Sequence, residues 1–312
     1  MSDPVFKTLV VTGKAVSLPA LLESVRWIAI VTGANKGIGL EISRQLSENG
    51  ILVVLTARAV GRGQAAVKKL QDVGVKDVIF HQLDISDPAS ITSLKEFVKT
   101  KFGKLDILVN NAGVGGVELQ SPTTLIEGDS QTLFDAINET YELSKECIDI
   151  NYYGTKAMCE AFIPLLHQSN SPRIVNVSST FGKLQFIPGD SIRKELRNID
   201  NLTEDRLEEL MESFLVDWKE GRLKESGWPD RTYSAYKVSK NAVSAYTRIL
   251  AKNYPKFIVN CVCPGYVKTD LIYNTGTQTV EEGAKGPVML ALLPDGSPSG
   301  QFYNQTEPTS FE

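Results

Sequence analysis

Two side chains that could carry out acid–base chemistry lie four residues apart in the segment Tyr236-Lys237-Val238-Ser239-Lys240. If this segment is helical, Tyr236 and Lys240 lie on the same face, one turn apart. An isolated tyrosine hydroxyl titrates near ~10 and is too weak an acid to protonate an alkoxide readily at neutral pH. A neighbouring ammonium favours the phenolate and lowers the pKa of the hydroxyl. The pair therefore predicts a general acid.

The spacing alone does not single out this pair. Tyr233 and Lys237 are also four residues apart, and a tyrosine and a lysine at this spacing on a helix are common in structural roles. Sequence spacing thus leaves both tyrosines open as the acid.

A glycine-rich turn joins a buried strand to a helix near the start of the chain. The run 27–31 is short, apolar and β-branched, as in a buried strand, and an amphipathic helical pattern follows from Ile38. Such a turn directs free backbone N–H groups and the positive helix end at one point, which suits a pyrophosphate. The alternative is a structural turn that binds nothing. We expect a dinucleotide to contact Gly33, Asn35, Lys36, Gly37, Ile38 and Gly39.

The end of the second strand predicts which dinucleotide binds. The strand 51–56 is followed by Ala57 and Arg58, and no acidic residue is present there to hold the ribose 2′-hydroxyl of NAD. Arg58 and Lys36 together fit a 2′-phosphate, whose oxygens match the arginine fork. Both could instead be solvated surface charges. The placement of the two cations favours NADPH/NADP+.

Strands and helices alternate along the chain. This alternation predicts an α/β fold, a Rossmann-type doubly wound parallel sheet of about seven strands, with ligands at the carboxyl ends of the strands. Asp84, which ends the third strand, could meet the adenine edge or cap a turn, and Asn111 follows the fourth strand. The strands are expected at 27–31, 51–56, 77–81 leading into 83–85, 105–109, 174–177, 258–262 and 300–303.

The helical segments carry further signals. Asp87 and Pro88 predict a helix start, as N-cap and first helical residue, and Thr279 with Glu282 forms a capping box. Helices are also expected at 64–70, at 131–166 with Asn151 inside it, and at 232–253. The stretch 180–232 is a helical insertion, with an apolar face expected to pack on the body of the protein: Leu207, Leu210, Met211, Phe214, Leu215 and Trp218.

Composition excludes several classes of partner. The 312 residues are 42% hydrophobic and 22% charged with a net charge of −4, which gives no electrostatic reason to expect nucleic acid or an anionic membrane. No apolar run approaches the ~20 residues that cross a bilayer. Four cysteines and two histidines, none at ligand spacing, argue against a disulfide framework and against a metal site. The N-terminus lacks the pattern of a secretory signal, so a cytoplasmic location is expected.

Six motifs in order resemble those of the short-chain dehydrogenase/reductase family: TGANKGIG, NNAG, the Asn151 helix, NVSS, YKVSK and PGYVKT. The resemblance runs from about Ile28 to the C-terminus. It implies that Asn151, Ser179, Tyr236 and Lys240 are catalytic, because the helix NAVSAYTRILA follows the family's tyrosine motif. It also implies that the nicotinamide half of the cofactor contacts Asn111, Tyr236, Lys240, Pro264, Gly265, Val267 and Thr269.

The family mechanism assigns a role to each of the four residues. Ser179 would hold the substrate carbonyl oxygen and Tyr236 would donate the proton while NADPH delivers hydride. Lys240 would bind the nicotinamide ribose and lower the pKa of the tyrosine, and Asn151 would hold a water that links Lys240 to solvent.

One departure narrows the branch of the family. The interval between Ser179 and Tyr236 is much longer than in most members. Together with GWP, CVCPG and PDGSPSGQFY, it resembles a plant branch of monomeric enzymes that act on bulky terpenoid or alkaloid ketones. Residues 1–25 form an uncertain leader before a single reductase domain at 26–312.

The resulting expectation is a monomeric NADPH-dependent carbonyl reductase acting on an apolar, cyclic ketone or related aldehyde. Two rivals stay open. One is an NADP-linked secondary alcohol dehydrogenase that works in the oxidative direction, and the other is an NADPH-binding protein without turnover.

Overall fold

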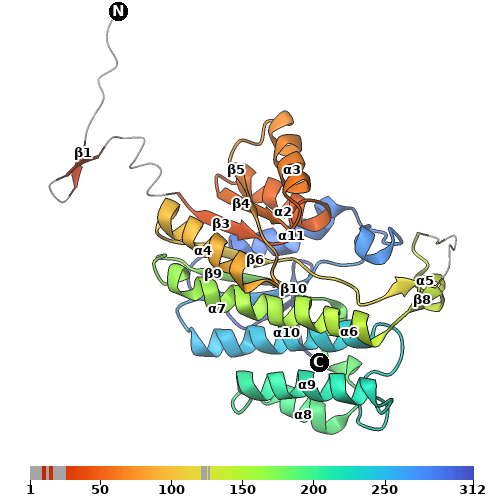
Figure 1. Ribbon diagram of the computed structural model, residues 1–312. Helices are drawn as coiled ribbons and strands as arrows, with labels where there is room; N and C mark the ends of the chain where they lie inside the picture. The colour runs from red at the N-terminus through yellow and green to blue at the C-terminus, as the bar shows by residue number, and fades with distance from the viewer. Residues whose placement is uncertain (1–8, 12–13, 17–25, 121–124, 126) are drawn as a thin grey trace, which may run out of the picture.

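An eight-stranded sheet, parallel except at one edge, forms the centre of the protein (Figure 1). The computed structural model describes residues 9–11, 14–16, 26–120, 125 and 127–312. The strand order is β12-β11-β10-β9-β6-β3-β4-β5. These strands are β3 (Ile28–Val31), β4 (Leu52–Ala57), β5 (Val78–Gln82), β6 (Ile107–Asn110), β9 (Arg173–Val177), β10 (Ile258–Cys263), β11 (Phe302–Asn304) and β12 (Glu307–Thr309).

The fold class predicted from the sequence is confirmed, but the strand count is eight rather than seven. The additional strand, β12, pairs antiparallel with β11 and contains Pro308. Two polar residues on either side of a proline carry no strand pattern, so only tertiary pairing reveals this strand. The third strand also differs from the prediction, because β5 ends at Gln82 and 83–85 is a loop.

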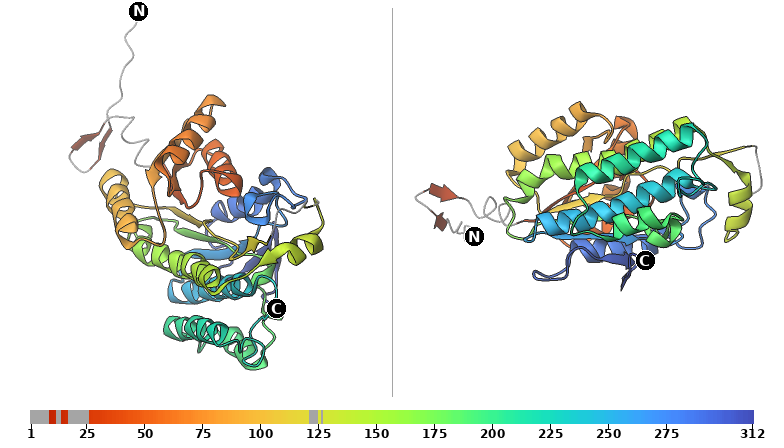
Figure 2. Two further views of the ribbon diagram at one scale, coloured as in Figure 1. Left: turned by 45° about the vertical axis from the view of Figure 1, so that its right-hand side comes forward. Right: turned by 90° about the horizontal axis from the view of Figure 1, so that it is seen from below.

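Helices cover both faces of the sheet, as the two views in Figure 2 show. One face carries α2 (Gly37–Glu48), α3 (Val60–Asp72) and α11 (Val280–Ala291), which share an apolar core with the strands. The other carries α4 (Pro88–Phe102), α7 (Thr155–Leu166) and α10 (Ser234–Asn253). Local signals start two of these helices as predicted: Asp87 accepts from the Ala89 amide, and Thr279 and Glu282 form the capping box.

The predicted helix 131–166 is interrupted. The structure divides it into α5 (Ser130–Ala136), α6 (Tyr141–Ile148), a π-helical turn η1 (Asp149–Gly154) and α7. Between α5 and α6, β8 (Ile137–Asn138) pairs with β7 (Glu118–Leu119). The prediction of one continuous helix was therefore wrong, because the pairing of β7 with β8 ends α5 and Thr140 caps a new helix at Tyr141.

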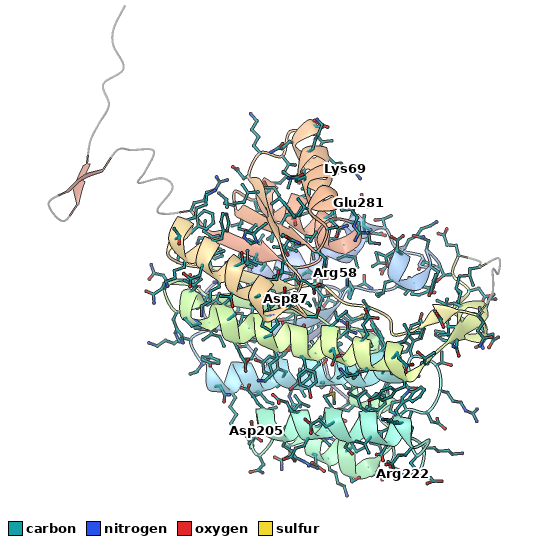
Figure 3. All side chains as sticks on the ribbon, in the orientation of Figure 1. Arg58, Lys69, Asp87, Asp205, Arg222 and Glu281 are labelled. Carbon is teal, nitrogen blue, oxygen red and sulfur yellow. The ribbon has the colours of Figure 1, made fainter. Side chains whose placement is uncertain are left out.

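The insertion forms a third layer outside α10 (Figure 1). It contains the short 3-10 turns η2 (Thr180–Gly182) and η3 (Leu184–Phe186), then α8 (Asp190–Arg197) and α9 (Glu204–Lys219). Leu207, Leu210, Met211 and Phe214 are buried in the core that α10 also contacts, so the predicted apolar face of this helix does pack on the body. Asp205 and Arg222 lie on this insertion, whereas Arg58 and Asp87 lie at the carboxyl edge of the sheet (Figure 3).

The N-terminal segment carries one pair of strands, β1 (Leu9–Val11) and β2 (Lys14–Val16), which are antiparallel to each other. The stretch TLVVTG, which imitates the glycine-rich turn but lacks its second and third glycines, falls here, and its residues 8, 12 and 13 lie outside the described residues. The division of the chain at about residue 25 remains a prediction.

Candidate active site

The turn between β3 and α2 has the backbone geometry that an anion site requires. Gly33 and Gly37 have φ of +63° and +58°, a region that residues with a Cβ rarely adopt. A Cβ at Gly39 would lie 2.8 Å from the Gly33 carbonyl oxygen, so only glycine fits. Lys36, the N-cap residue of α2, makes no side-chain cap hydrogen bond. The first amides of the helix are thus available to a ligand.

Thr32 ties this turn to the chain that follows β6. Its hydroxyl accepts hydrogen bonds from the backbone amides of Asn111 and Ala112, both at 2.9 Å. The side-chain Nδ2 of Asn111 in turn donates to the Thr32 carbonyl oxygen at 2.9 Å. Two segments nearly eighty residues apart therefore form one rigid wall at the carboxyl edge of the sheet.

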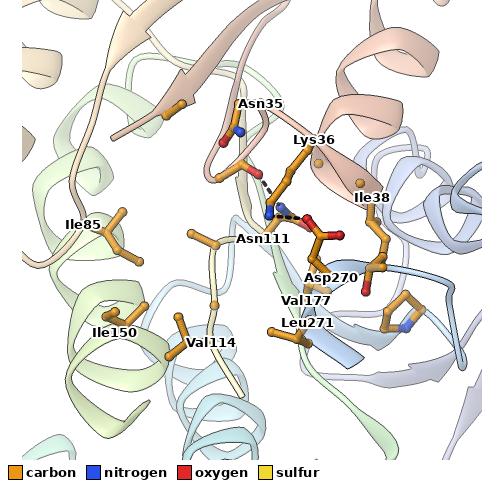
Figure 4. Close-up of a pocket in the computed structure, with 18 of the residues that line it drawn as sticks. Asn35, Lys36, Ile38, Ile85, Asn111, Val114, Ile150, Val177, Asp270 and Leu271 are labelled. Carbon is orange, nitrogen blue, oxygen red and sulfur yellow. Dashed lines mark hydrogen bonds and ion pairs between the residues drawn. The ribbon is translucent and has the colours of Figure 1, made fainter. Parts of the chain in front are cut away.

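A cavity of about 500 Å³ opens at this edge (Figure 4). Most of the cofactor-binding residues expected from the sequence line it: Gly33, Asn35, Lys36, Gly37, Ile38, Gly39, Arg58, Asp84, Asn111, Tyr236, Lys240, Pro264 and Thr269. Gly265 and Val267 do not line it. Val267 is buried, and its side chain packs against Gly283 of α11. The loop after β10 therefore faces the cavity through Pro264, residues 268–271 and Asn274.

Several residues of the cavity were not found from the sequence. Arg62 lines it from the first turn of α3, whereas Arg58 lies just before that helix. A second arginine in the segment that follows the same strand was a signal that could have found it. Among the apolar walls, Val177 is part of the NVSS motif, whereas Ile85 was not singled out by any motif and Ile150 only precedes Asn151, so the fold alone shows that these two reach this edge.

Lys36 and Asp270 meet across the mouth of the cavity. The ammonium nitrogen of Lys36 lies 2.5 Å from a carboxylate oxygen of Asp270 in the loop after β10, and both side chains are exposed (Figure 4). The ammonium lowers the pKa of the Asp270 carboxyl below its ordinary value. Lys36 therefore reaches the cavity, but in this structure its charge is paired with a protein carboxylate.

Asp84 has a structural partner as well as a place in the cavity wall. One of its carboxylate oxygens accepts from the Ser86 amide at 3.0 Å and from the Ser86 hydroxyl at 2.6 Å. This is the turn-capping geometry that the sequence left open for it.

Tyr236 and Lys240 both face the cavity from the start of α10. Lys240 is buried, and its Nζ donates to the Val177 carbonyl oxygen at 2.9 Å and lies 5.6 Å from the centre of the Tyr236 ring. Burial lowers the pKa of Lys240 to about 8. Burial also raises the pKa of Tyr236, and a hydrogen bond with Ser179 opposes that rise. Without a ligand, both groups are therefore biased toward their neutral forms.

The second tyrosine–lysine pair is arranged differently. Tyr233 has a φ of +61° and lies before the first residue of α10. The Nζ of Lys237 donates to the carbonyl oxygens of Thr232, at 2.7 Å, and Arg231, at 3.1 Å. Lys237 thus binds the turn before the helix and does not line the cavity, whereas Tyr236 and Lys240 do.

The two serines after β9 also differ. Ser178 is buried, with its hydroxyl 3.2 Å from the Lys240 carbonyl oxygen and 2.9 Å from the Ser244 hydroxyl. The Ser179 hydroxyl is half-buried, accepts from the Phe181 amide at 3.2 Å and lies close enough to the Tyr236 phenol to oppose the rise of its pKa. Ser179 is therefore the serine that lies beside the tyrosine.

Asn151 is buried in the π-helical turn, close to Lys240. Its side-chain oxygen accepts from the Val114 amide at 2.8 Å, and its Nδ2 donates to the Val114 carbonyl oxygen at 2.9 Å and to the Ser239 hydroxyl at 3.0 Å. A Cβ on Gly113 would lie 3.0 Å from the Asn151 side-chain oxygen and 3.5 Å from the Lys240 Nζ. Because its side chain is fully engaged, a water relay from Asn151 would use the main-chain carbonyl.

An apolar cluster covers the outer side of Tyr236. It joins the loops near residues 117–137, the 3-10 turn after Ser179 and the chain after β10, with Tyr233 at its centre. The rings of Phe181 and Tyr233 lie 6.3 and 5.8 Å from that of Tyr236. The Tyr236 ring is therefore packed against two aromatic rings. Residues 121–124 and 126 of the expected substrate loop lie outside the described residues.

The described residues include no helix that is long and apolar enough to cross a membrane. Nor do His, Cys, Asp and Glu side chains gather in groups of three or more that could hold a metal ion in this part of the chain.

Comparison with known proteins identifies the family. The family model described as "short chain dehydrogenase" matches residues 27–190. (+)-Neomenthol dehydrogenase of Arabidopsis thaliana is 53% identical over 91% of this chain and 97% of its own length. Carbonyl reductase [NADPH] 3 of Rattus norvegicus is 40% identical over 88% and 95%.

A solved structure gives the same result. Salutaridine reductase from Papaver somniferum superposes with a TM-score of 0.84 at 47% identity, covering 89% of this chain and 99% of that one. The matched residues contain the glycine turn and Ser179, and the wider matches extend over the whole reductase body. The chain therefore belongs to the short-chain dehydrogenase family of oxidoreductases, which use a nicotinamide cofactor to interconvert C=O and CH–OH groups.

Proposed function

We propose that this protein is an NADPH-dependent carbonyl reductase that transfers hydride to an apolar, cyclic terpenoid or alkaloid ketone, or a related aldehyde. The observation that carries the proposal is the meeting of Tyr236, Lys240 and Ser179 beside one cavity that begins at a glycine-rich helix N-terminus. A phenol with an ammonium and a hydroxyl close to it forms a proton donor beside a bound carbonyl.

The residues present fit a dinucleotide. The open amides of α2 and the glycines at 33, 37 and 39 would hold the pyrophosphate, and Lys240 and Asn111 would hold the nicotinamide half. When bound, the reduced nicotinamide supplies the hydride. Its oxidised form is positively charged and favours the phenolate of Tyr236, opposing the effect of burial on that pKa.

Three cations support NADPH over NADH. Arg58, Arg62 and Lys36 line the end of the cavity next to β4, where an NAD enzyme would carry a carboxylate for the ribose 2′-hydroxyl. Guanidinium groups match the oxygens of a phosphate in pairs. The rat relative, named as an NADPH carbonyl reductase, agrees with this assignment.

The protein groups divide the remaining chemistry. Ser179 donates a hydrogen bond to the substrate carbonyl oxygen and stabilises the charge that develops there. Tyr236 donates its proton to the same oxygen. Lys240 binds the nicotinamide ribose and stabilises the phenolate that remains, and the Asn151 carbonyl holds the water that returns a proton to Lys240.

The substrate class follows from the aromatic surroundings of Tyr236. The rings of Phe181 and Tyr233, which pack near the Tyr236 ring within an apolar cluster, favour a bulky apolar molecule over a small polar one. Relatives named for neomenthol and for salutaridine agree with a terpenoid or alkaloid ketone.

The proposal also includes a monomeric state and a cytoplasmic location for the protein. The α8–α9 layer covers the outer faces of α6 and α10 with buried apolar side chains. A partner subunit could therefore reach neither helix without displacing the insertion.

The test is loss of NADPH absorbance with a panel of monoterpene and alkaloid ketones. Tyr236→Phe removes the proton and should reduce turnover by at least a hundredfold, whereas Tyr233→Phe removes a neighbouring hydroxyl and should not. Turnover that survives in Tyr236→Phe would refute the assigned acid. Activity only with alcohols and NADP+ would favour the dehydrogenase rival, and NADPH binding without any turnover would favour the non-catalytic one.

A further inference from the structure

The turn that leads into α10 has an unusual backbone. Thr232 and Tyr233, the two residues before the helix, have φ of +45° and +61°. Residues other than glycine rarely adopt this region, and a residue in it is strained unless its surroundings hold it there. Tyr236 follows in the first turn of the helix. The orientation of the proposed acid therefore depends on what holds this turn.

Lys237 is the first of two side chains that hold it. Its ammonium donates to the carbonyl oxygens of Arg231 and Thr232, on the side of the turn that precedes the helix. A cation at the positive end of a helix is unfavourable by itself. The ammonium of Lys237 is stable here because the two carbonyl oxygens and the nearby Glu139 carboxylate offset this unfavourable interaction.

Glu139 is the second. Its carboxylate accepts from the Ser234 amide, the first of α10, at 2.8 Å. Tyr233, at the N-cap position, makes no side-chain cap hydrogen bond. The helix is thus capped by a residue 95 positions away. Glu139 directly follows β8, whose Ile137 packs against Tyr233 in the apolar cluster beside Tyr236.

We propose that Glu139 and Lys237 are positioning residues for Tyr236. They fix the strained turn so that the first turn of α10 points the hydroxyl at Ser179 and at the substrate carbonyl. This inference rests on the proposed function, in which Tyr236 is the proton donor.

The experiment compares Glu139→Ala, which removes the acceptor, with Glu139→Gln, which keeps an acceptor and removes the charge. Glu146→Ala, an exposed glutamate on α6, is the matched control. Since loss of a charged hydrogen bond costs 1.5–3 kcal/mol, Glu139→Ala should lower kcat roughly ten- to hundredfold. Its dissociation constant for NADPH should change less than twofold, because the glycine turn is untouched.

Two readouts separate positioning from a merely structural role. A misplaced proton donor makes proton transfer more rate-limiting, so the solvent deuterium isotope effect on kcat should increase in Glu139→Ala and return toward wild type in Glu139→Gln. Lys237→Met should lower kcat in the same way, again with NADPH affinity retained. Amide hydrogen exchange at residues 232–238 should increase in both Glu139→Ala and Lys237→Met.

Three results would overturn the inference: unchanged kcat and exchange in Glu139→Ala, a parallel loss of kcat and NADPH affinity, or failure of Glu139→Gln to restore the isotope effect. Failure of the proposed function is recognised separately, since the wild-type protein would then turn over no ketone. In that case hydrogen exchange alone decides whether Glu139 and Lys237 fix the turn. Exchange rates equal to those of the wild type in both Glu139→Ala and Lys237→Met would reject that role.

Discussion

The ammonium of Lys36 lies 2.5 Å from a carboxylate oxygen of Asp270, so the phosphate turn and the loop after β10 are joined by an ion pair over the cavity. Any anion that binds beside Lys36 must compete with this carboxylate. The affinity for a phosphate-bearing cofactor therefore depends on Asp270, although its negative charge repels a phosphate.

Asp270→Asn should tighten NADPH binding because Lys36 is then released without competition. An exposed ion pair contributes about 0.2–1 kcal/mol, so the dissociation constant should fall by up to about fivefold. The difference should shrink at high salt. Titration of NADPH fluorescence measures it, with Asp205→Asn on the distant insertion as control. Weaker binding in Asp270→Asn would show that the carboxylate assists the cofactor.

Arg58→Ala should weaken NADPH far more than NADH. A charged hydrogen bond to a phosphate contributes 1.5–3 kcal/mol, so NADPH should lose roughly ten- to hundredfold in affinity. NADH, which has no 2′-phosphate, should change less than threefold. Arg222→Ala, on the insertion, is the matched control. If the affinities for NADPH and NADH fell equally, the cations at the end of β4 would not distinguish the two cofactors. Arg62→Ala should then also lower both affinities equally.

The burial of Lys240 predicts how stability depends on pH in the absence of ligand. Its pKa is lowered from 10.5 to about 8 in the folded protein. Between these two values the unfolded chain binds one more proton, so wild-type stability rises with pH. Relative to Lys240→Met, the free energy of unfolding of the wild type should increase by about 3 kcal/mol from pH 8 to pH 10.5. Urea titrations at several pH values measure this difference, and a constant or falling difference would contradict it.

The insertion should depend on Phe214. This ring is fully buried between the insertion and the body, and Phe214→Ala should cost about 3–5 kcal/mol of unfolding free energy. Val216, two residues further on the same helix, is 51% exposed, and Val216→Ala should change stability by less than about 0.5 kcal/mol. Thermal unfolding with and without NADPH measures both. If Phe214→Ala and Val216→Ala changed the unfolding free energy equally, the insertion would not share the apolar core of the body.

The sequence predicts the parts of this fold that local signals specify. Asp87 and the Thr279–Glu282 box start helices as expected, since a cap involves only residues within one turn. The apolar, β-branched strands were found for the same reason. The strand β12 and the break between α5 and α6 were missed, because pairing with distant chain decides them.

The candidate site shows the same division. The glycine turn, Arg58 and the Tyr236–Lys240 spacing can be read from neighbouring residues. The pairing of Lys36 with Asp270 spans 234 positions, and the capping of Ser234 by Glu139 spans 95. No local pattern encodes such contacts, so only the folded chain reveals them. The roles of the site residues stay predictions until the variants above are measured.

The π-helical turn at Asp149–Gly154 sets the rotational phase of two helices. A π turn holds one residue more than an α turn, and each residue turns a helix by about 100°. Before this turn α6 faces α10 and the insertion, and after it α7 faces α4 and the sheet. Deleting a single residue here would restore regular winding and force a choice: either Asn151 keeps its contacts with Val114, or α7 keeps its apolar side on the sheet.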